Sequence, residues 1–134
     1  MLLGVPCLAV LAAAAMLDPA GGGHGTHEQM GIPPCSLLSQ TGWPCPSCGL
    51  TTSVTATAHG ELGLAWRSQP FGLPLFVLLT AGALGGVAEL VGGRSLLHRV
   101  RPRLWWVWVL VGGMAVGWGY KALTGYLAGQ YPLP

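Results

Sequence analysis

The stretch that decides the fold is FGLPLFVLLTAGALGGVA, residues 71–88, which carries no charged side chain. As a helix rising ~1.5 Å per residue it reaches about 27 Å, close to the hydrocarbon thickness of a bilayer. The run extends to Val91 if the Glu89 carboxylate reaches the membrane surface. We therefore predict a membrane-spanning helix over about residues 71–91.

The composition of the whole chain agrees with this prediction. Of its 134 residues, 51% are hydrophobic and only 7% are charged. Ordinary soluble domains carry roughly 25% charged residues. Disordered chains combine low hydrophobicity with high net charge, and this chain has neither. The composition is that of a membrane protein.

A second spanning helix is predicted over residues 104–126. Residues 104–120 carry no charge. Aromatic side chains gather near both ends of the predicted span. These are Trp105, Trp106, Trp108, Trp118, Tyr120 and Tyr126. Aromatic belts of this kind mark the two membrane–water interfaces of a spanning helix.

The N-terminal part divides into an apolar run and a linker. Residues 1–17 carry no charge, and both a retained membrane anchor and a cleaved signal peptide fit them; the missing basic n-region favours the anchor. Residues 18–34 contain three consecutive glycines and the pair Pro33-Pro34. They predict a flexible linker without regular structure.

The remaining membrane domain covers residues 35–134 and begins with a cysteine-rich loop. After the loop, residues 50–66 predict a short interfacial helix, with Thr51 or Thr52 as its N-cap and Gly60 as a break. The predicted fold is all-α, an integral membrane protein with two or three transmembrane helices and this interfacial helix.

An arginine cluster predicts the orientation of the chain in the membrane. Its members are Arg94, Arg99, Arg101 and Arg103. The positive-inside rule places them on the cytoplasmic side and the cysteine-rich loop outside, with Arg67 as the one dissenting cation. Because the cluster lies between apolar runs, we expect no nucleic acid as a partner. The expected partners are the lipid bilayer, other membrane proteins or a homo-oligomer.

Small residues suggest how the two spans pack. Gly82 and Gly86 are four residues apart, as are Gly113 and Gly117, so each pair lies on one helix face. Such faces let helix backbones approach closely in membranes. We predict that the two faces pack against each other, although membrane helices are rich in glycine in any case.

The most specific motif is Cys45-Pro46-Ser47-Cys48-Gly49, in which two thiols converge. In a metal knuckle, Pro46 stiffens the turn and Gly49 adopts a left-handed conformation. In a redox site, a helix N-terminus acidifies the first thiol, so that Cys45 attacks and Cys48 resolves. Whether the pair lies in a knuckle or opens a helix decides between them.

A tetrahedral metal site needs two further ligands. Cys35 is the natural third, since it lies in the same loop. Candidates for the fourth are His24, His27, Glu28 and His59. The predicted set is Cys35, Cys45, Cys48 and His27, which suits zinc.

Two other interpretations of these residues stay open. His24 and His27, with Met30 and Cys35, also resemble a soft-metal site, copper included. An oxidising exterior would pair two of the three loop cysteines in a structural disulfide and leave one thiol free. Cys7, within the apolar N-terminal run, is expected to be a small buried side chain.

The stretch from Cys35 to Phe71 resembles a known family. It contains Cys35, the segment TGWPCPSCGLT at residues 41–51, His59-Gly60-Glu61 and Gln69-Pro70. This order is similar to the domain of unknown function 2752 family of small bacterial membrane proteins. The resemblance implies a location in the bacterial inner (plasma) membrane and names no activity.

The chain departs from the family pattern at two positions. Thr52 stands where the family usually has Arg, and Gln69 where it usually has Asn. If that Arg anchors a thiolate, phosphate or headgroup, Arg67 is the nearest substitute. We expect a binding or assembly role built on a structural metal or disulfide site. The alternative is a membrane thiol-disulfide oxidoreductase that uses Cys45 and Cys48.

Overall fold

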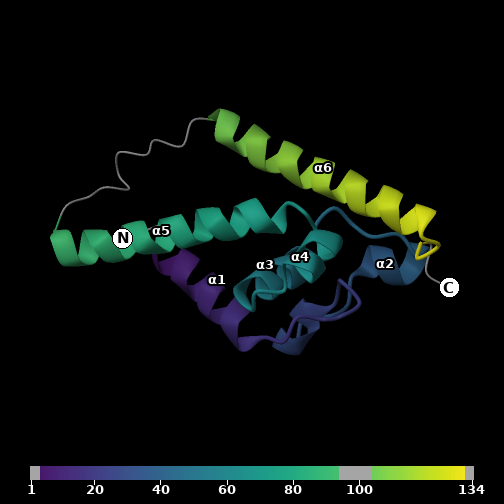
Figure 1. The fold of residues 1–134 in the computed structure, drawn as a ribbon, viewed down its shortest axis with the longest axis horizontal. Helices are drawn as coiled ribbons and strands as arrows, with labels where there is room; N and C mark the ends of the chain where they lie inside the picture. The colour runs from purple at the N-terminus through teal and green to yellow at the C-terminus, as the bar shows by residue number, and fades with distance from the viewer. Residues whose placement is uncertain (1–3, 94–103, 132–134) are drawn as a thin grey trace.

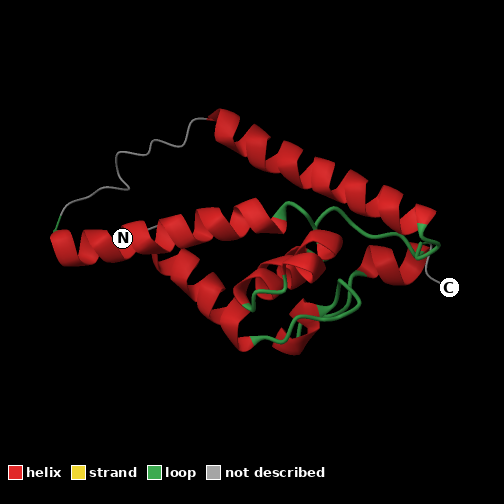
Figure 2. Cartoon of the chain, viewed as in Figure 1, coloured by secondary structure: helices red, strands yellow, loops and turns green. Residues whose placement is uncertain are grey.

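The computed structural model describes residues 4–93 and 104–131, and every regular element in these ranges is a helix (Figure 1 and Figure 2). In chain order the elements are α1 (Gly4–Met16), the 3-10 helix η1 (Thr26–Met30), α2 (Ser36–Thr41), α3 (Leu50–Ala58), α4 (Leu62–Ser68), α5 (Gly72–Gly92) and α6 (Leu104–Leu127). The predicted all-α class is confirmed for this part of the chain.

One described helix, α5, is long and apolar enough to cross a membrane. It has 21 residues, and only 11% of its most apolar window is buried. The prediction over residues 104–126 is confirmed as a helix, α6, but α6 does not reach the same hydropathy, since it contains Lys121 and several tryptophans and tyrosines. α1, with 13 residues, is shorter than a span. By length and composition, the described residues support one span rather than two or three.

The centre of the fold is α3, which packs against α1, α4, α5 and η1. Its buried side chains are small, and several carry hydroxyl groups. Ser53 Oγ lies 2.8 Å from both Ala65 O and Gln69 O and donates to these carbonyls at the end of α4. Gly72, the first residue of α5, packs directly on the Ser53 side chain. Small side chains, of which Ser53 and Thr52 have internal hydrogen-bond partners, thus allow a polar helix to be buried, although Thr55 Oγ1 has no partner among the described residues.

The predicted interfacial helix over residues 50–66 is divided in two. α3 ends at Ala58 and α4 begins at Leu62, with Gly60 between them at φ +79°, as expected of a break. The predicted N-cap is wrong. The cap of α3 is Gly49, while Thr51 and Thr52 lie inside the helix. The Thr52 hydroxyl instead accepts a hydrogen bond of 2.8 Å from Thr26 of η1.

The predicted packing of the glycine faces is also wrong. Gly82 and Gly86 of α5 face α1, not α6. A Cβ added at Gly86 would lie 2.5 Å from Gly4 Cα, and one at Gly82 would lie 2.8 Å from Cys7 Sγ. Gly113 and Gly117 of α6 instead accommodate the Phe71 side chain. A glycine face fits any closely approaching surface, so spacing alone does not select its partner.

The helix α6 is attached to the rest of the fold through side chains that reach loops. Trp118 Nε1 donates to Pro44 O at 2.7 Å, and the Trp43 ring stacks on Tyr126 with centroids 6.0 Å apart. Figure 1 shows α6 on the side of α5 away from α1, α3 and α4. The arginine cluster of residues 94–103 lies outside the described residues, so the predicted orientation stays a prediction.

Residues 18–34 contain more structure than the sequence suggested. The 3-10 helix η1 lies within them and contacts α3. The Gln29 side chain both donates to Asp18 O at 2.6 Å and accepts from Asp18 N at 3.1 Å. The glycines and prolines punctuate this segment without preventing a short helix from docking.

Candidate metal centre

The Cys-x-x-Cys motif forms a tight turn directly before α3. Cys48 N donates to Cys45 O at 2.9 Å, and Leu50 N donates to Ser47 O at 3.1 Å. The Cys45 Sγ and Ser47 Oγ atoms are 3.3 Å apart. Both cysteines therefore lie in the turn rather than in the helix. Because the turn leads directly into α3, its position fits both a knuckle and a redox pair at a helix N-terminus.

Gly49 links this turn to α3 and has no room for a side chain. Its φ is +85°, the left-handed conformation that the knuckle interpretation predicts. A Cβ at this position would lie 2.5 Å from each of three atoms, Gly23 O, Ser68 O and Lys121 Nζ. Gly49 is thus required by both its backbone conformation and its surroundings.

Cys35 reaches the motif from a different segment. It is the residue before α2, and Gly42 ends that helix in a left-handed conformation. The sulfur atoms of Cys35, Cys45 and Cys48 all lie within 4.8 Å of one another. All four cysteines of the chain are free thiols. The predicted convergence of the three loop thiols is present in the structure, while the predicted disulfide is not formed in it.

The three thiols are not equivalent. The backbone amide of Leu38, in the first turn of α2, lowers the pKa of Cys35 below its ordinary value of 9.0. Burial raises the pKa of Cys48 to about 11, although the positive charge of Lys121 acts against this rise. Cys48 thus favours the protonated thiol in the absence of a bound cation. Metal coordination removes such protons, because the ligand form is the thiolate.

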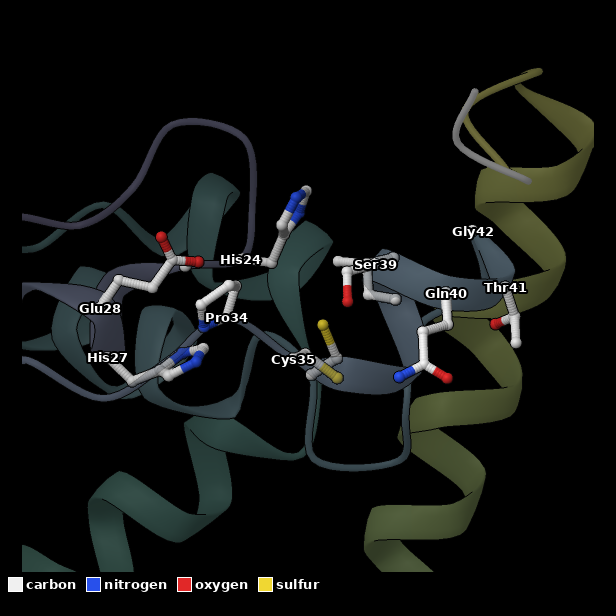
Figure 3. A pocket seen from close by; sticks show the side chains of 12 residues that line it. His24, His27, Glu28, Pro34, Cys35, Ser39, Gln40, Thr41 and Gly42 are labelled. Atoms are coloured by element: carbon white, nitrogen blue, oxygen red, sulfur yellow. The ribbon is translucent and has the colours of Figure 1, made fainter.

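The predicted fourth ligand, His27, lines a cavity of about 270 Å³ together with the three cysteines. A neighbouring pocket of about 420 Å³ is lined by both His24 and His27, and also by Glu28, Cys35 and Cys48. Figure 3 shows Cys35 in this pocket between His27 and Glu28 on one side and the α2 residues on the other. His24 Nδ1 is buried and has no hydrogen-bond partner within the described residues.

Two other suggested ligands lie elsewhere. His59 Nε2 is 3.0 Å from Leu17 O, near the end of α1. Met30 lines an apolar cavity between α1, α3 and α5 rather than the cysteine cavity. The soft-metal set that included Met30 is therefore not assembled in the structure.

Sequence reasoning missed Lys121, which contacts the motif from α6. Lys121 is only 5% exposed, and its Nζ donates to Gly23 O and Cys48 O, both at 3.1 Å. The cation that bonds to the cysteine turn is thus Lys121, rather than the Arg67 that the sequence suggested as the nearest substitute. Arg67 is exposed and its Nε bonds to Gly63 O at 3.3 Å. The one sign of this contact in the sequence is that Lys121 is the single charged residue of α6.

Gln69 also supports the motif. It is fully buried, and its Nε2 donates to Pro46 O at 3.1 Å and to Met114 O at 3.4 Å. The residue before Pro70 thus joins the cysteine turn to α6. The sequence marked this position as a departure from the family pattern without indicating its contacts.

Comparison with known proteins gives one match. The family described as Protein of unknown function (DUF2752) matches residues 35–83. No curated protein and no solved structure matches the chain. The matched range starts at Cys35, includes the knuckle and the Gln69-Pro70 pair, and ends within α5. The match confirms the predicted resemblance of these residues to the domain of unknown function 2752 family.

Proposed function

We propose that this protein is a small membrane protein with a structural zinc site formed by Cys35, Cys45, Cys48 and His27. The site fastens the loop before α2, the knuckle and η1 to the helical bundle. Its role is in binding or assembly rather than in catalysis. The side of the membrane that carries the site is the extracytoplasmic one.

The observation that carries the proposal is the approach of three sulfur atoms to within 4.8 Å of one another. They come from two segments, since Cys35 precedes α2 and the other two lie in the turn before α3. Tetrahedral zinc with Zn–S bonds of ~2.3 Å separates two sulfur ligands by about 3.8 Å. The cluster requires only a small contraction to reach this spacing.

The fourth ligand is assigned to His27 because it lines the cavity that all three cysteines line. Three thiolates and one imidazole form an established class of structural zinc site. With zinc bound, such a set has a net charge of −1. The Lys121 ammonium, bonded to the Cys48 carbonyl, lies where it offsets this charge.

Membrane insertion is supported by the outward-facing apolar surface of α5. Val77, Leu84 and Val91 are 66%, 66% and 86% exposed. A core helix of a soluble protein would bury such side chains. Lipid is the proposed partner for this surface, and the arginine cluster argues for a cytoplasmic loop after α5.

Metal analysis of the purified full chain tests the site. We expect about one zinc ion per chain, as judged by elemental analysis after purification in detergent without chelator. In native protein no thiol other than Cys7 should react with a thiol reagent before chelation, and all four should react after chelation and unfolding. Cys45→Ser should abolish zinc binding, while Cys7→Ser should leave it intact.

The histidines provide a matched pair for the fourth ligand. His27→Ala should lower zinc affinity by tenfold or more, and His24→Ala should have little effect. The reverse pattern would identify His24 as the fourth zinc ligand. A metal-free protein that cycles between dithiol and disulfide through Cys45 would refute the structural site and support the oxidoreductase instead.

Thiol labelling of intact cells tests the orientation. After chelation, a membrane-impermeant reagent should label the cluster thiols from outside. A cysteine introduced as Ser95→Cys should react only after the cells are permeabilised. Labelling of Ser95→Cys in intact cells would reverse the proposed orientation.

A further inference from the structure

A fourth cavity, of about 230 Å³, lies between the glycine loop at residues 21–23, α4 and the end of α6. Arg67 and Lys121 both line it, together with the hydroxyl-bearing residues Tyr120 and Tyr131. Among the described residues, no carboxylate lines this cavity. Two cations without an acidic neighbour make it a site for an anion.

We infer that this cavity binds a phosphate group, held by Arg67 and Lys121. Its source is the headgroup of an anionic phospholipid or a free phosphate ion. The proposed phosphate and zinc sites share Lys121, which also bonds to the Cys48 carbonyl, while Arg67 belongs to the phosphate site alone. The lipid source depends on the proposed membrane insertion.

The two cations retain donors for such a ligand. Lys121 has three N–H donors, of which its bonds to Gly23 O and Cys48 O use two. The Arg67 guanidinium has five N–H donors, and the bond from its Nε to Gly63 O uses one. Arginine forms paired hydrogen bonds to two phosphate oxygens, which a lysine alone does not.

Aromatic residues beside the cavity support its position at a membrane surface. Trp66 Nε1 donates to Tyr120 OH at 3.1 Å, which connects α4 to α6. Both side chains are substantially exposed, at 50% and 42%. Tryptophan and tyrosine concentrate at the level of lipid headgroups. The start of α5, Gly72, follows α4 by a few residues, so the cavity lies near the end of the proposed span.

This assignment also accounts for Arg67 as the cation that dissents from the positive-inside pattern. On the proposed outer face, a lone arginine has no role as a topology signal. As a ligand for phosphate it has a chemical reason to be there. Its partner Lys121 is the lone cation of α6, and both lie on the wall of the same cavity.

Calorimetric titration of the full-length protein in a neutral, phosphate-free detergent tests the inference. The probes are dihexanoyl phosphatidic acid, inorganic phosphate and dihexanoylglycerol, which has the same acyl chains without phosphate. We expect saturable binding of the phosphatidic acid and none of the dihexanoylglycerol. Competition by inorganic phosphate at equal concentration would identify a free anion as the ligand. Absence of competition would identify the lipid headgroup.

The variants separate this site from general charge effects. Arg67→Gln should weaken phosphatidic acid binding about tenfold or more, because a charge-assisted hydrogen-bond pair is lost. Arg99→Gln makes the same change in net charge at the predicted cytoplasmic loop and should alter binding less than twofold. Lys121→Met should also weaken binding, with its circular dichroism spectrum recorded to check the fold.

Two results would overturn the inference. One is binding that Arg67→Gln leaves unchanged or that Arg99→Gln reduces equally. The other is equal binding of dihexanoylglycerol. Cys45→Ser should still bind phosphatidic acid, so that a failed zinc site and a failed phosphate site give different results.

Discussion

The substitution Gly49→Ala probes the tightest point of the structure. At φ +85° a side chain meets backbone strain, and the new Cβ would lie 2.5 Å from Gly23 O, Ser68 O and Lys121 Nζ. The lysine end can move aside. The two carbonyl oxygens belong to the backbone, so the loop at Gly23 and the end of α4 would have to shift.

The expected loss of stability has three sources. A non-glycine residue in the left-handed region costs about 1–2 kcal/mol. Overpacking against backbone costs a further ~1–3 kcal/mol. Displacing Lys121 from its carbonyl partners removes a charge-assisted hydrogen bond of about 1.5–3 kcal/mol. The sum, about 3.5–8 kcal/mol, is a large share of the ~5–15 kcal/mol that stabilises a typical domain.

Gly60→Ala is the matched control. Gly60 has a similar φ, +79°, and nothing within 4 Å of the position a Cβ would take. It should therefore show the backbone cost alone, about 1–2 kcal/mol.

Unfolding of the metal-free variants in detergent, followed by circular dichroism with heat or denaturant, provides the comparison. We expect the Gly49→Ala midpoint to fall at least about 10 °C below that of Gly60→Ala, on the basis of a few degrees per kcal/mol. Equal midpoints would show that Gly23, Ser68 and Lys121 do not crowd Gly49 as described.

Two further predictions concern helix packing and the buried thiol. Gly86→Leu should lower the free energy of unfolding in detergent by about 1–3 kcal/mol more than Gly119→Leu, because it disrupts the contact of α5 with α1. Gly119 is the control, since a Cβ there would have nothing within 4 Å. Equal losses would contradict the close approach of Gly86 to Gly4. Burial raises the pKa of Cys48 from 9.0 to about 11, so the folded metal-free protein binds this proton more tightly than the unfolded chain. The resulting stability, about 2–3 kcal/mol, should be present below pH 9 and lost as the pH rises toward 11, and Cys48→Ser should show a correspondingly smaller loss.

The long helices could be predicted because hydropathy is a local property. The predictions over residues 71–91 and 104–126 match α5 and α6 within one residue at each end. The break at Gly60 also followed from its residue type. By contrast, α2 is only six residues long and carries no clear apolar period, so its sequence does not distinguish it from a loop.

The cysteine cluster was predictable in part. Two thiols three positions apart in a turn must lie close together, and Cys35 was the nearest third. The contacts of Lys121 were not predictable, since its carbonyl partners are 98 and 73 positions away in the chain. Likewise, the spacing of Gly82 and Gly86 shows that α5 has a flat face, but only the folded chain shows that α1 covers it.

Because α6 follows the cysteine turn by many residues, the turn is synthesised before its contacts with α6 exist. The carbonyl groups of Gly23 and Cys48 can bond to Lys121 only after residue 121 has been made. The Pro44 carbonyl likewise can accept its hydrogen bond only after Trp118 has been made. At a translation rate of ~5–20 residues per second, the interval between Cys48 and Lys121 is about 4–15 s. Throughout that interval the cysteine turn lacks the contacts that α6 supplies in the folded chain. The turn is therefore synthesised well before the helix that completes its surroundings.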